Sequence, residues 1–215
     1  MAAMRKLILK MSLSLDNFAC GPNGELEWIF ETRDERATTW TLETLWQAGA
    51  HLMGSRTYYD MAAFWPTSSE PYAAAMNDIP KVVFSRKTSL APPSLALTSP
   101  ALRDAMRANA EAGEPPIVFA PTRSWTEPTL ANGELAEEIK ALKAQPGKDL
   151  LAHGGVGFAQ SLIATRLIDE YRLLVHPVAL GSGMPLFSAL AKPLKLLLAS
   201  AIQFEGPVAL VYHPA

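Results

Sequence analysis

Cysteine and histidine are scarce in this chain of 215 residues, which contains one cysteine and four histidines. Cys20 has no second cysteine with which to form an internal disulfide, and this is typical of a protein from a reducing compartment. Cys20 lies beside Gly21-Pro22 in an expected loop, and the sequence indicates no base near it, so a catalytic thiol is not predicted. The four histidines lie far apart and match no metal-ligand spacing. We therefore expect no metal site.

An excess of charge of one sign and long apolar runs are also missing. The formal net charge is -2 and the isoelectric point is about 6.1, which excludes the basic field that attracts nucleic acid or an anionic membrane. No apolar run approaches the roughly 20 residues that span a bilayer. Residues 1–13 do not have the pattern of a secretory signal. We expect a cytoplasmic protein with no nucleic-acid or membrane partner.

The composition that remains is that of a globular protein, with 49% hydrophobic and 19% charged residues. The length suits one domain, which we expect to span residues 1–215. Residues 87–123 are rich in proline and alanine and contain too few apolar residues for a core of their own. We interpret this segment as an insertion within the single domain.

Hydrophobic periodicity predicts strands that alternate with helices. We expect strands at 7–13, 50–53, 81–84, 149–152 and 168–175, helices at 34–48, 54–61, 133–143 and 155–164, and a closing hairpin formed by 194–204 and 208–212. Within the insertion we expect a helix at 101–111 and a strand at 117–119. This order is typical of an α/β fold in which a mostly parallel sheet is covered on both faces and carries an antiparallel C-terminal hairpin.

In such sheets ligands bind at the carboxyl ends of the strands. Three strand ends here carry suitable residues, namely Gly54-Ser55-Arg56-Thr57, Ser85-Arg86 and Gly154-Gly155-Val156-Gly157. Helix N-termini attract phosphate, glycine lets the backbone approach it, and two arginines can clamp a ribose 2′-phosphate. The glycine run is not the Rossmann fingerprint, because Gln160 occupies its last glycine position. Two alternatives stay open: a glycine turn needed only for packing, and arginines that are solvated surface charges.

These motifs resemble a known family. The runs Gly54–Tyr58, Phe84–Arg86 and His153–Gly155 are similar in order and context to the dihydrofolate reductase fold. The runs from Ser12 to Asn17, from Gly24 to Trp28 and from Gly154 to Phe187 resemble more closely the reductase (RibD C-terminal) domain of bifunctional riboflavin-biosynthesis proteins and their stand-alone relatives. The resemblance covers the chain except for about 87–123.

The resemblance implies a dihydrofolate reductase-like three-layer α/β/α fold, NADPH as cofactor and a homodimer. The residues that it implies for cofactor binding are Gly54, Ser55, Arg56, Thr57, Ser85, Arg86, His153, Gly154, Gly155, Val156 and Gly157. The leucine-rich run 194–198 suits extension of the sheet across a two-fold axis, which is one way to form the dimer.

A reductase that takes its hydride from a nicotinamide needs only a proton source from the protein or an ordered water. Asp16, at the end of the first strand, is the candidate donor and a candidate substrate contact. Its alternative role is that of an Asx-turn residue. Glu31, Asp34 and Glu35 are weaker candidates. Trp28 is predicted either to stack on a planar substrate or to belong to the core.

Three features depart from the riboflavin-pathway pattern. His153 stands where those reductases usually have glutamate, Asn17 stands where the family often has glycine, and we expect no deaminase domain within these 215 residues. We interpret His51, His176 and His213 as structural or surface residues. The sequence therefore predicts an NADPH-dependent reductase of a small heterocyclic substrate that is pterin- or aminopyrimidine-like. The alternatives are a nucleotide- or ligand-binding protein that has lost turnover, and a structural dimer whose insertion covers the phosphate site.

Overall fold

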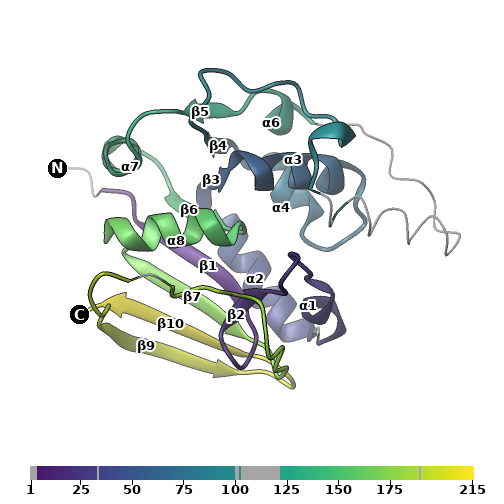
Figure 1. Cartoon of the computed structure of the whole chain (residues 1–215), viewed down its shortest axis with the longest axis vertical. Coiled ribbons are helices and arrows are strands. Elements are labelled where there is room, and N and C mark those ends of the chain that lie inside the picture. Colours follow the sequence, from purple (N-terminus) through teal and green to yellow (C-terminus); the bar gives the residue numbers. More distant parts are fainter. Residues whose placement is uncertain (1–3, 33, 100–101, 103–121, 189) are drawn as a thin grey trace, which may run out of the picture.

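A computed structural model describes residues 4–32, 34–99, 102, 122–188 and 190–215. An eight-stranded sheet crosses the molecule in the order β5-β4-β3-β6-β1-β7-β10-β9 (Figure 1). Its strands are β1 (Leu7–Leu13), β3 (Ala48–Gly54), β4 (Lys81–Phe84), β5 (Thr129–Ala131), β6 (Asp149–His153), β7 (Glu170–Val175), β9 (Leu196–Gln203) and β10 (Val208–Pro214). The six strands from β5 to β7 are parallel, whereas β10 and β9 are antiparallel. The predicted sheet and hairpin are confirmed.

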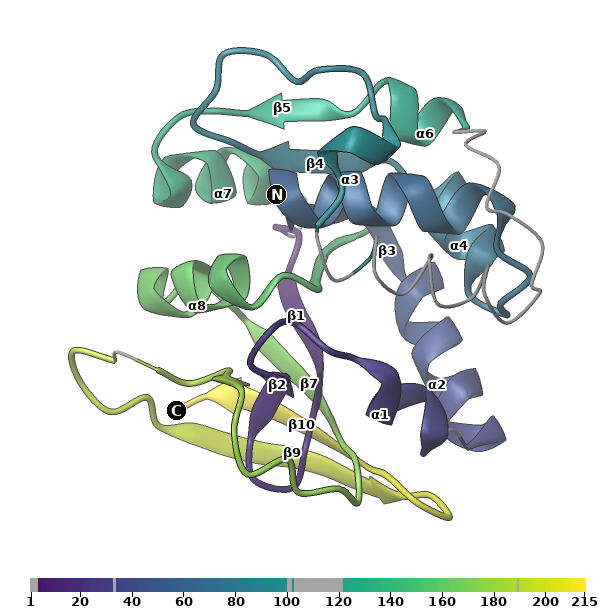
Figure 2. The same ribbon diagram turned by 45° about the vertical axis from the view of Figure 1, so that its right-hand side comes forward.

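Helices cover both faces of this sheet, so the predicted three-layer arrangement is also confirmed (Figure 2). They are α1 (Glu27–Glu31), α2 (Glu35–Trp46), α3 (Ser55–Phe64), α4 (Ala73–Asp78), α6 (Arg123–Thr126), α7 (Leu135–Ala144) and α8 (Val156–Thr165), with short 3₁₀ turns η1 (Trp65–Thr67) and η2 (Leu95–Leu97). A separate antiparallel pair is formed by β2 (Phe18–Cys20) and β8 (Met184–Pro185). No helix in the described part of the chain is long and apolar enough to cross a membrane.

The sequence prediction missed several short elements, namely β2, β5, β8, α1, α4 and α6. They have two to six residues, a length over which a helical or alternating pattern is weak, although the equally short strands β4 and β6 were predicted. The helix expected at 101–111 and the strand expected at 117–119 lie outside the described residues, apart from Leu102. The insertion at 87–123 and the single-domain organisation therefore stay predictions.

Strand side chains alternate between two helical layers, as the period of a β-strand requires. One set packs against α7 and α8, and we call this side of the sheet the α8 face. The other set packs against α2, α3 and α4, and we call it the α2 face. In β1, for example, Leu7 and Leu9 belong to the α8 face and Ile8 to the α2 face. Because the six central strands are parallel, their carboxyl ends lie along one edge of the sheet.

Candidate functional site

Two of the three predicted strand ends meet in space. β3 ends at Gly54 and β6 ends at His153, and the two strands are hydrogen-bonded neighbours. A methyl group added to Gly155 would collide with Thr57 Oγ1, and one added to Gly154 would lie 2.9 Å from Met61 Cε. Both glycines have positive φ, 84° at Gly154 and 77° at Gly155. Packing against α3 and backbone conformation thus already require glycine at both positions.

The helices that begin at these strand ends lack the features that normally satisfy a helix N-terminus. Neither α3, with Gly54 as N-cap, nor α8, with Gly155 as N-cap, has a side-chain cap or an acidic residue in its first turn. By contrast, Asp34 caps α2 by accepting a hydrogen bond from the Ala37 N–H at 2.7 Å. The α7 helix has two glutamates in its first turn. Two neighbouring N-termini therefore keep their partial positive charge available to an anion.

Gly157 in the first turn of α8 is the least constrained of these glycines. A methyl group built on it would have no neighbour within 4 Å, so the space beside this turn is open. Gly157 also lines a cavity of about 330 Å³ that runs along α8. The other residues around this cavity are Gln160, Ser161, Ala164, Arg166, Ser188, Leu190 and Ala191.

The third predicted junction lies one strand further along the same edge. β4 pairs with β3, and the Ser85 N–H extends the pairing toward β5 by donating to the Ala131 carbonyl at 3.1 Å. The side chains of Arg56 and Arg86 are exposed. Within the part of the chain that the structure describes, neither forms an ion pair. An exposed arginine at a strand end suits a phosphate ligand and is equally compatible with a solvated surface charge.

Asp16 has its carboxylate fully engaged. It accepts hydrogen bonds from Ser14 Oγ at 2.6 Å, from the Gly181 N–H at 2.7 Å and from the Leu180 N–H at 3.1 Å. These hydrogen bonds lower the pKa of Asp16 to about 2, and the one from the Ser14 hydroxyl has the largest effect. An ionised carboxylate of this kind ties the loop after β1 to residues 180–181. The geometry thus supports the turn-forming role of Asp16 and gives no support to a proton-donating one.

The weaker carboxylate candidates do not converge on a site either. Asp34 caps α2 with one oxygen and accepts from the Glu205 N–H at 3.0 Å with the other. Glu31 and Glu35 are exposed. Among the described residues, no group of three or more His, Cys, Asp or Glu side chains is arranged to hold a metal ion.

His153 points into the α2 face of the sheet. It is 8% exposed, and its ring meets that of His51 edge-on with 4.4 Å between the centroids. His153 is paired in register with Lys10, and His51 with Lys81, so four basic side chains form a row across β1, β6, β3 and β4. Burial, followed by the charges of Lys10 and Lys81, lowers the pKa of His153 to about 3. Both histidines are therefore neutral at pH 7.

The lysines of this row were not singled out from the sequence. Burial lowers the pKa of Lys10 to about 8 and that of Lys81 to about 7. Lys81 donates to the Ile79 carbonyl and lies 4.3 Å from the centre of the Trp125 ring. The sequence did contain a signal for Lys10 and Lys81: each occupies a strand position whose side chain is expected to face a helical layer, where lysine is rare.

Trp28 is core rather than a free stacking platform. It lies in α1, is 6% exposed, and donates from Nε1 to the Glu25 carbonyl at 3.3 Å. Its ring meets His176 edge-on, with 5.3 Å between the centroids. The core interpretation of Trp28 is thus the one that the geometry favours, and it places His176 beside α1.

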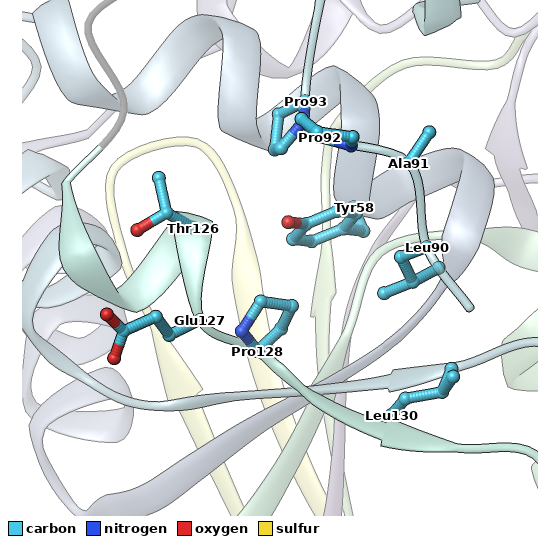
Figure 3. Close-up of a pocket in the computed structure, with 9 residues that line it drawn as sticks. All are labelled: Tyr58, Leu90, Ala91, Pro92, Pro93, Thr126, Glu127, Pro128 and Leu130. Carbon is cyan, nitrogen blue, oxygen red and sulfur yellow. The ribbon is translucent and has the colours of Figure 1, made fainter.

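A further cavity of about 310 Å³ lies beside α3, where Tyr58 faces a proline-rich segment (Figure 3). Its lining consists of Tyr58, Leu90, Ala91, Pro92, Pro93, Thr126, Glu127, Pro128 and Leu130. Tyr58 donates its hydroxyl proton to the Trp125 carbonyl. None of the residues predicted for cofactor or substrate binding lines this cavity.

The fold and the paired helix starts define a dihydrofolate reductase-like α/β domain. Comparison with known families specifies it further: residues 5–210 match the RibD C-terminal domain, and the chain belongs to this family. The resemblance inferred from the strand-end motifs is thereby confirmed.

Individual relatives agree with this assignment. The chain is 28% identical over 212 residues to the uncharacterized protein YyaP of Bacillus subtilis, covering 97% of this chain and 95% of YyaP. Its fold is similar to that of a putative riboflavin biosynthesis protein from Shewanella sp. PV-4, with a TM-score of 0.67, 20% identity, and 98% and 99% of the two chains covered. It also resembles a Thermotoga maritima diaminohydroxyphosphoribosylaminopyrimidine deaminase/5-amino-6-(5-phosphoribosylamino)uracil reductase, with a TM-score of 0.62 and 12% identity. The match covers 99% of this chain and 57% of that protein.

Proposed function

We propose that the chain is an NADPH-dependent reductase that transfers a hydride to a small heterocyclic substrate of the pterin or aminopyrimidine kind. The observation that carries the proposal is the pair of uncapped helix starts, α3 and α8, at neighbouring strand ends of a RibD C-terminal domain. Two such N-termini side by side form a natural site for a pyrophosphate. The Thermotoga relative is named as a reductase of an aminopyrimidine derivative, which supports the substrate class.

NADPH, when bound, supplies the hydride. The backbone N–H groups at Gly54–Thr57 and Gly154–Gly157 would hold its pyrophosphate. Arg56 and Arg86 would hold the ribose 2′-phosphate, because the planar guanidinium group pairs well with phosphate oxygens. The loop held by Asp16 would border the substrate. The proton for the reduced substrate then comes from water, since Asp16 has a pKa of about 2 and is ionised at pH 7.

The test is a titration of the purified protein with NADPH and with NADH, followed by the quenching of tryptophan emission. We expect tighter binding of NADPH, and a loss of at least tenfold in NADPH affinity in the Arg56→Ala/Arg86→Ala double variant. The Arg123→Ala variant is a matched control, because Arg123 is an exposed arginine on α6 that pairs with Glu127. A protein that binds neither nucleotide is not a reductase of this kind.

A second candidate function is nucleotide or ligand binding without turnover. The engaged carboxylate of Asp16 favours it, because no protonated carboxyl group is indicated beside the expected pocket. Steady consumption of NADPH with any member of a panel of pterins and aminopyrimidines supports the reductase. Saturable NADPH binding with no consumption across that panel supports the binding protein.

We also propose that the chain forms a homodimer through β9. This strand is the last in the sheet order, so one edge of its backbone has no partner strand in the described structure. Its sequence, Leu196–Gln203, has no charged residue, and Leu197 and Leu198 are 61% and 55% exposed. An uncharged edge can pair with its own copy about a two-fold axis. Light scattering should show a dimer that the Leu197→Lys variant converts to a monomer; a monomeric wild-type protein contradicts the proposal.

A further inference from the structure

His176 occupies a buried position just beyond β7 that neither the sequence motifs nor the phosphate site explains. Its backbone N–H donates to the Leu13 carbonyl at 2.7 Å, so it lies level with the end of β1. The register pairs Ser12 with Leu174, which places the side chains of Lys10 and Ser12 on the same face as Leu174. Residue 176 is two positions further along and therefore continues on that face, under α1.

The hydrogen bonds around His176 favour one tautomer of its ring. Thr32 Oγ1 lies 2.7 Å from His176 Nδ1 and donates its single proton to the Trp28 carbonyl at 2.8 Å. The Trp28 carbonyl can only accept, so a hydroxyl that bonds both groups donates its proton to Trp28 and accepts from the ring, which assigns the ring hydrogen to Nδ1. The other nitrogen, Nε2, is then a bare acceptor.

This acceptor is buried and has no hydrogen-bond partner among the described residues. The ring is 2% exposed. Burial, followed by the charge of Lys10, lowers the pKa of His176 to about 4, so the ring is neutral at pH 7. Trp28 of α1 contacts the ring edge-on, and Thr32, the residue after α1, is hydrogen-bonded to Nδ1. Neither of these two residues donates a hydrogen bond to Nε2.

A buried acceptor without a partner is unfavourable, and such groups in folded proteins are usually satisfied by a ligand or an ordered water. The same face carries Lys10 and Ser12, which are partly exposed, whereas the His176 ring itself is covered. It also continues into His153, whose register partner is Lys10 and which precedes the glycine turn of the expected cofactor site. This face thus runs from His176 through Lys10 to the residue that precedes the glycine turn.

We propose that His176 is a specificity-determining residue whose Nε2 accepts a hydrogen bond from a ring N–H or amino group of the substrate. The inference rests on the proposed reductase function and deepens it. It requires a heterocycle that presents a hydrogen-bond donor at this point, and it disfavours one that presents only a carbonyl oxygen or a methyl group there.

The first experiment needs no substrate. Two-bond ¹H–¹⁵N correlation spectra of the ¹⁵N-histidine-labelled protein at pH 7 report which ring nitrogen carries the hydrogen, and the His176→Leu variant assigns the signals. We expect His176 to be neutral and protonated at Nδ1. A ring protonated at Nε2, or at both nitrogens, overturns the proposal.

The second experiment uses two probes, a diaminouracil and its ring-N-methylated derivative, each titrated into the NADPH-saturated protein. We expect the wild type to bind the unmethylated probe at least tenfold more tightly. His176→Leu should lose this preference, whereas His176→Gln, which can present an amide oxygen near the place of Nε2, should keep part of it. The exposed His213 provides the control variant His213→Leu.

These outcomes separate the two proposals. A wild type that binds neither nucleotide ends the reductase proposal, while the tautomer measurement still decides the state of His176. A wild type that binds NADPH but shows no preference between the probes, or a His176→Leu variant that retains the preference, overturns the role of His176 and leaves the reductase proposal standing.

Discussion

The two faces of the central sheet differ in how they use their buried positions. The α8 face is filled by apolar side chains, including Leu7, Leu9 and Leu150, which pack against α7 and α8. The α2 face packs against α2, α3 and α4, but it buries His51 and His153, whose rings leave nitrogens without partners among the described residues. Polar groups buried in this way cost stability. The difference teaches that the α8 face stabilises the fold, whereas the α2 face retains groups that stability alone would remove.

The sharpest way to test this contrast is pH. Burial, above all, holds the pKa of His51 well below 6.5 and that of His153 at about 3, while their unfolded-state pKa is about 6.5. Between these values the unfolded chain binds protons that the folded one does not, so stability is complete above pH 6.5 and falls as the pH decreases. From pH 7 to pH 5 we expect a loss of about 2 kcal/mol for each of these histidines.

Urea unfolding at pH 7 and pH 5 measures this loss, and the window avoids most of the titration of carboxylates. In the His153→Leu variant, the loss of unfolding free energy between pH 7 and pH 5 should be smaller than in the wild type by the contribution of one histidine, about 2 kcal/mol. Equal pH dependence in the variant and the wild type would mean that His153 is solvated in the folded protein, and the contrast between the faces would weaken.

Leu150→Ala and His51→Leu provide the next comparison, because the two residues are 0% exposed and lie on opposite faces of neighbouring strands. Removing the leucine should cost about 2–5 kcal/mol through lost burial and a cavity. Replacing the histidine by an apolar side chain of similar size removes ring nitrogens that are buried with at most a poorly formed hydrogen bond to the Leu45 backbone, so the free energy of unfolding should stay equal or rise by about 1 kcal/mol. Urea unfolding at pH 7 measures both; a large loss in His51→Leu would refute the contrast.

Much of this architecture could be predicted from the sequence, and the reasons for the failures are physical. Alternation in 7–13 and the helical period in 34–48 are local properties, so β1 was found with its observed bounds and α2 with errors of one and two residues at its ends. The rule that parallel strands end at one edge also brought Gly54–Thr57 and Gly154–Gly157 together correctly. The three-residue strand β5 carries too little pattern to be recognised.

The chemical details of the site depend on contacts between residues far apart in the chain. The residue type of Asp16 suggested an acid, but its pKa depends on Ser14 and on backbone N–H groups at 180 and 181. The row across the α2 face depends on the strand order, because His51 and His153 become neighbours only when β3 pairs with β6. No local pattern contains that information.

Gly155→Ala tests the glycine turn, where the expected effect is smaller. The added methyl group would collide with Thr57 Oγ1, and φ is 77°. We expect a loss of roughly 1–3 kcal/mol in stability and weaker NADPH binding, because the start of α8 must shift. Gly157→Ala is the matched control and should be tolerated, since nothing lies within 4 Å of the added group. Equal unfolding midpoints for the two variants would show that the turn adjusts freely.

For Gly157→Asp we expect the smallest change in stability. This variant distinguishes the effect of the start of α8 on stability from its effect on NADPH binding. An aspartate in the first turn interacts favourably with the helix dipole, and leaving glycine reduces the entropy of the unfolded chain. We therefore expect the free energy of unfolding to rise by about 0.3–1 kcal/mol. The added negative charge would repel the proposed pyrophosphate, so NADPH affinity should fall at least tenfold and further than in the uncharged Gly157→Ala variant. A more stable protein with unchanged NADPH affinity would mean that the nucleotide binds elsewhere, because one N-terminus cannot serve two anions at full strength.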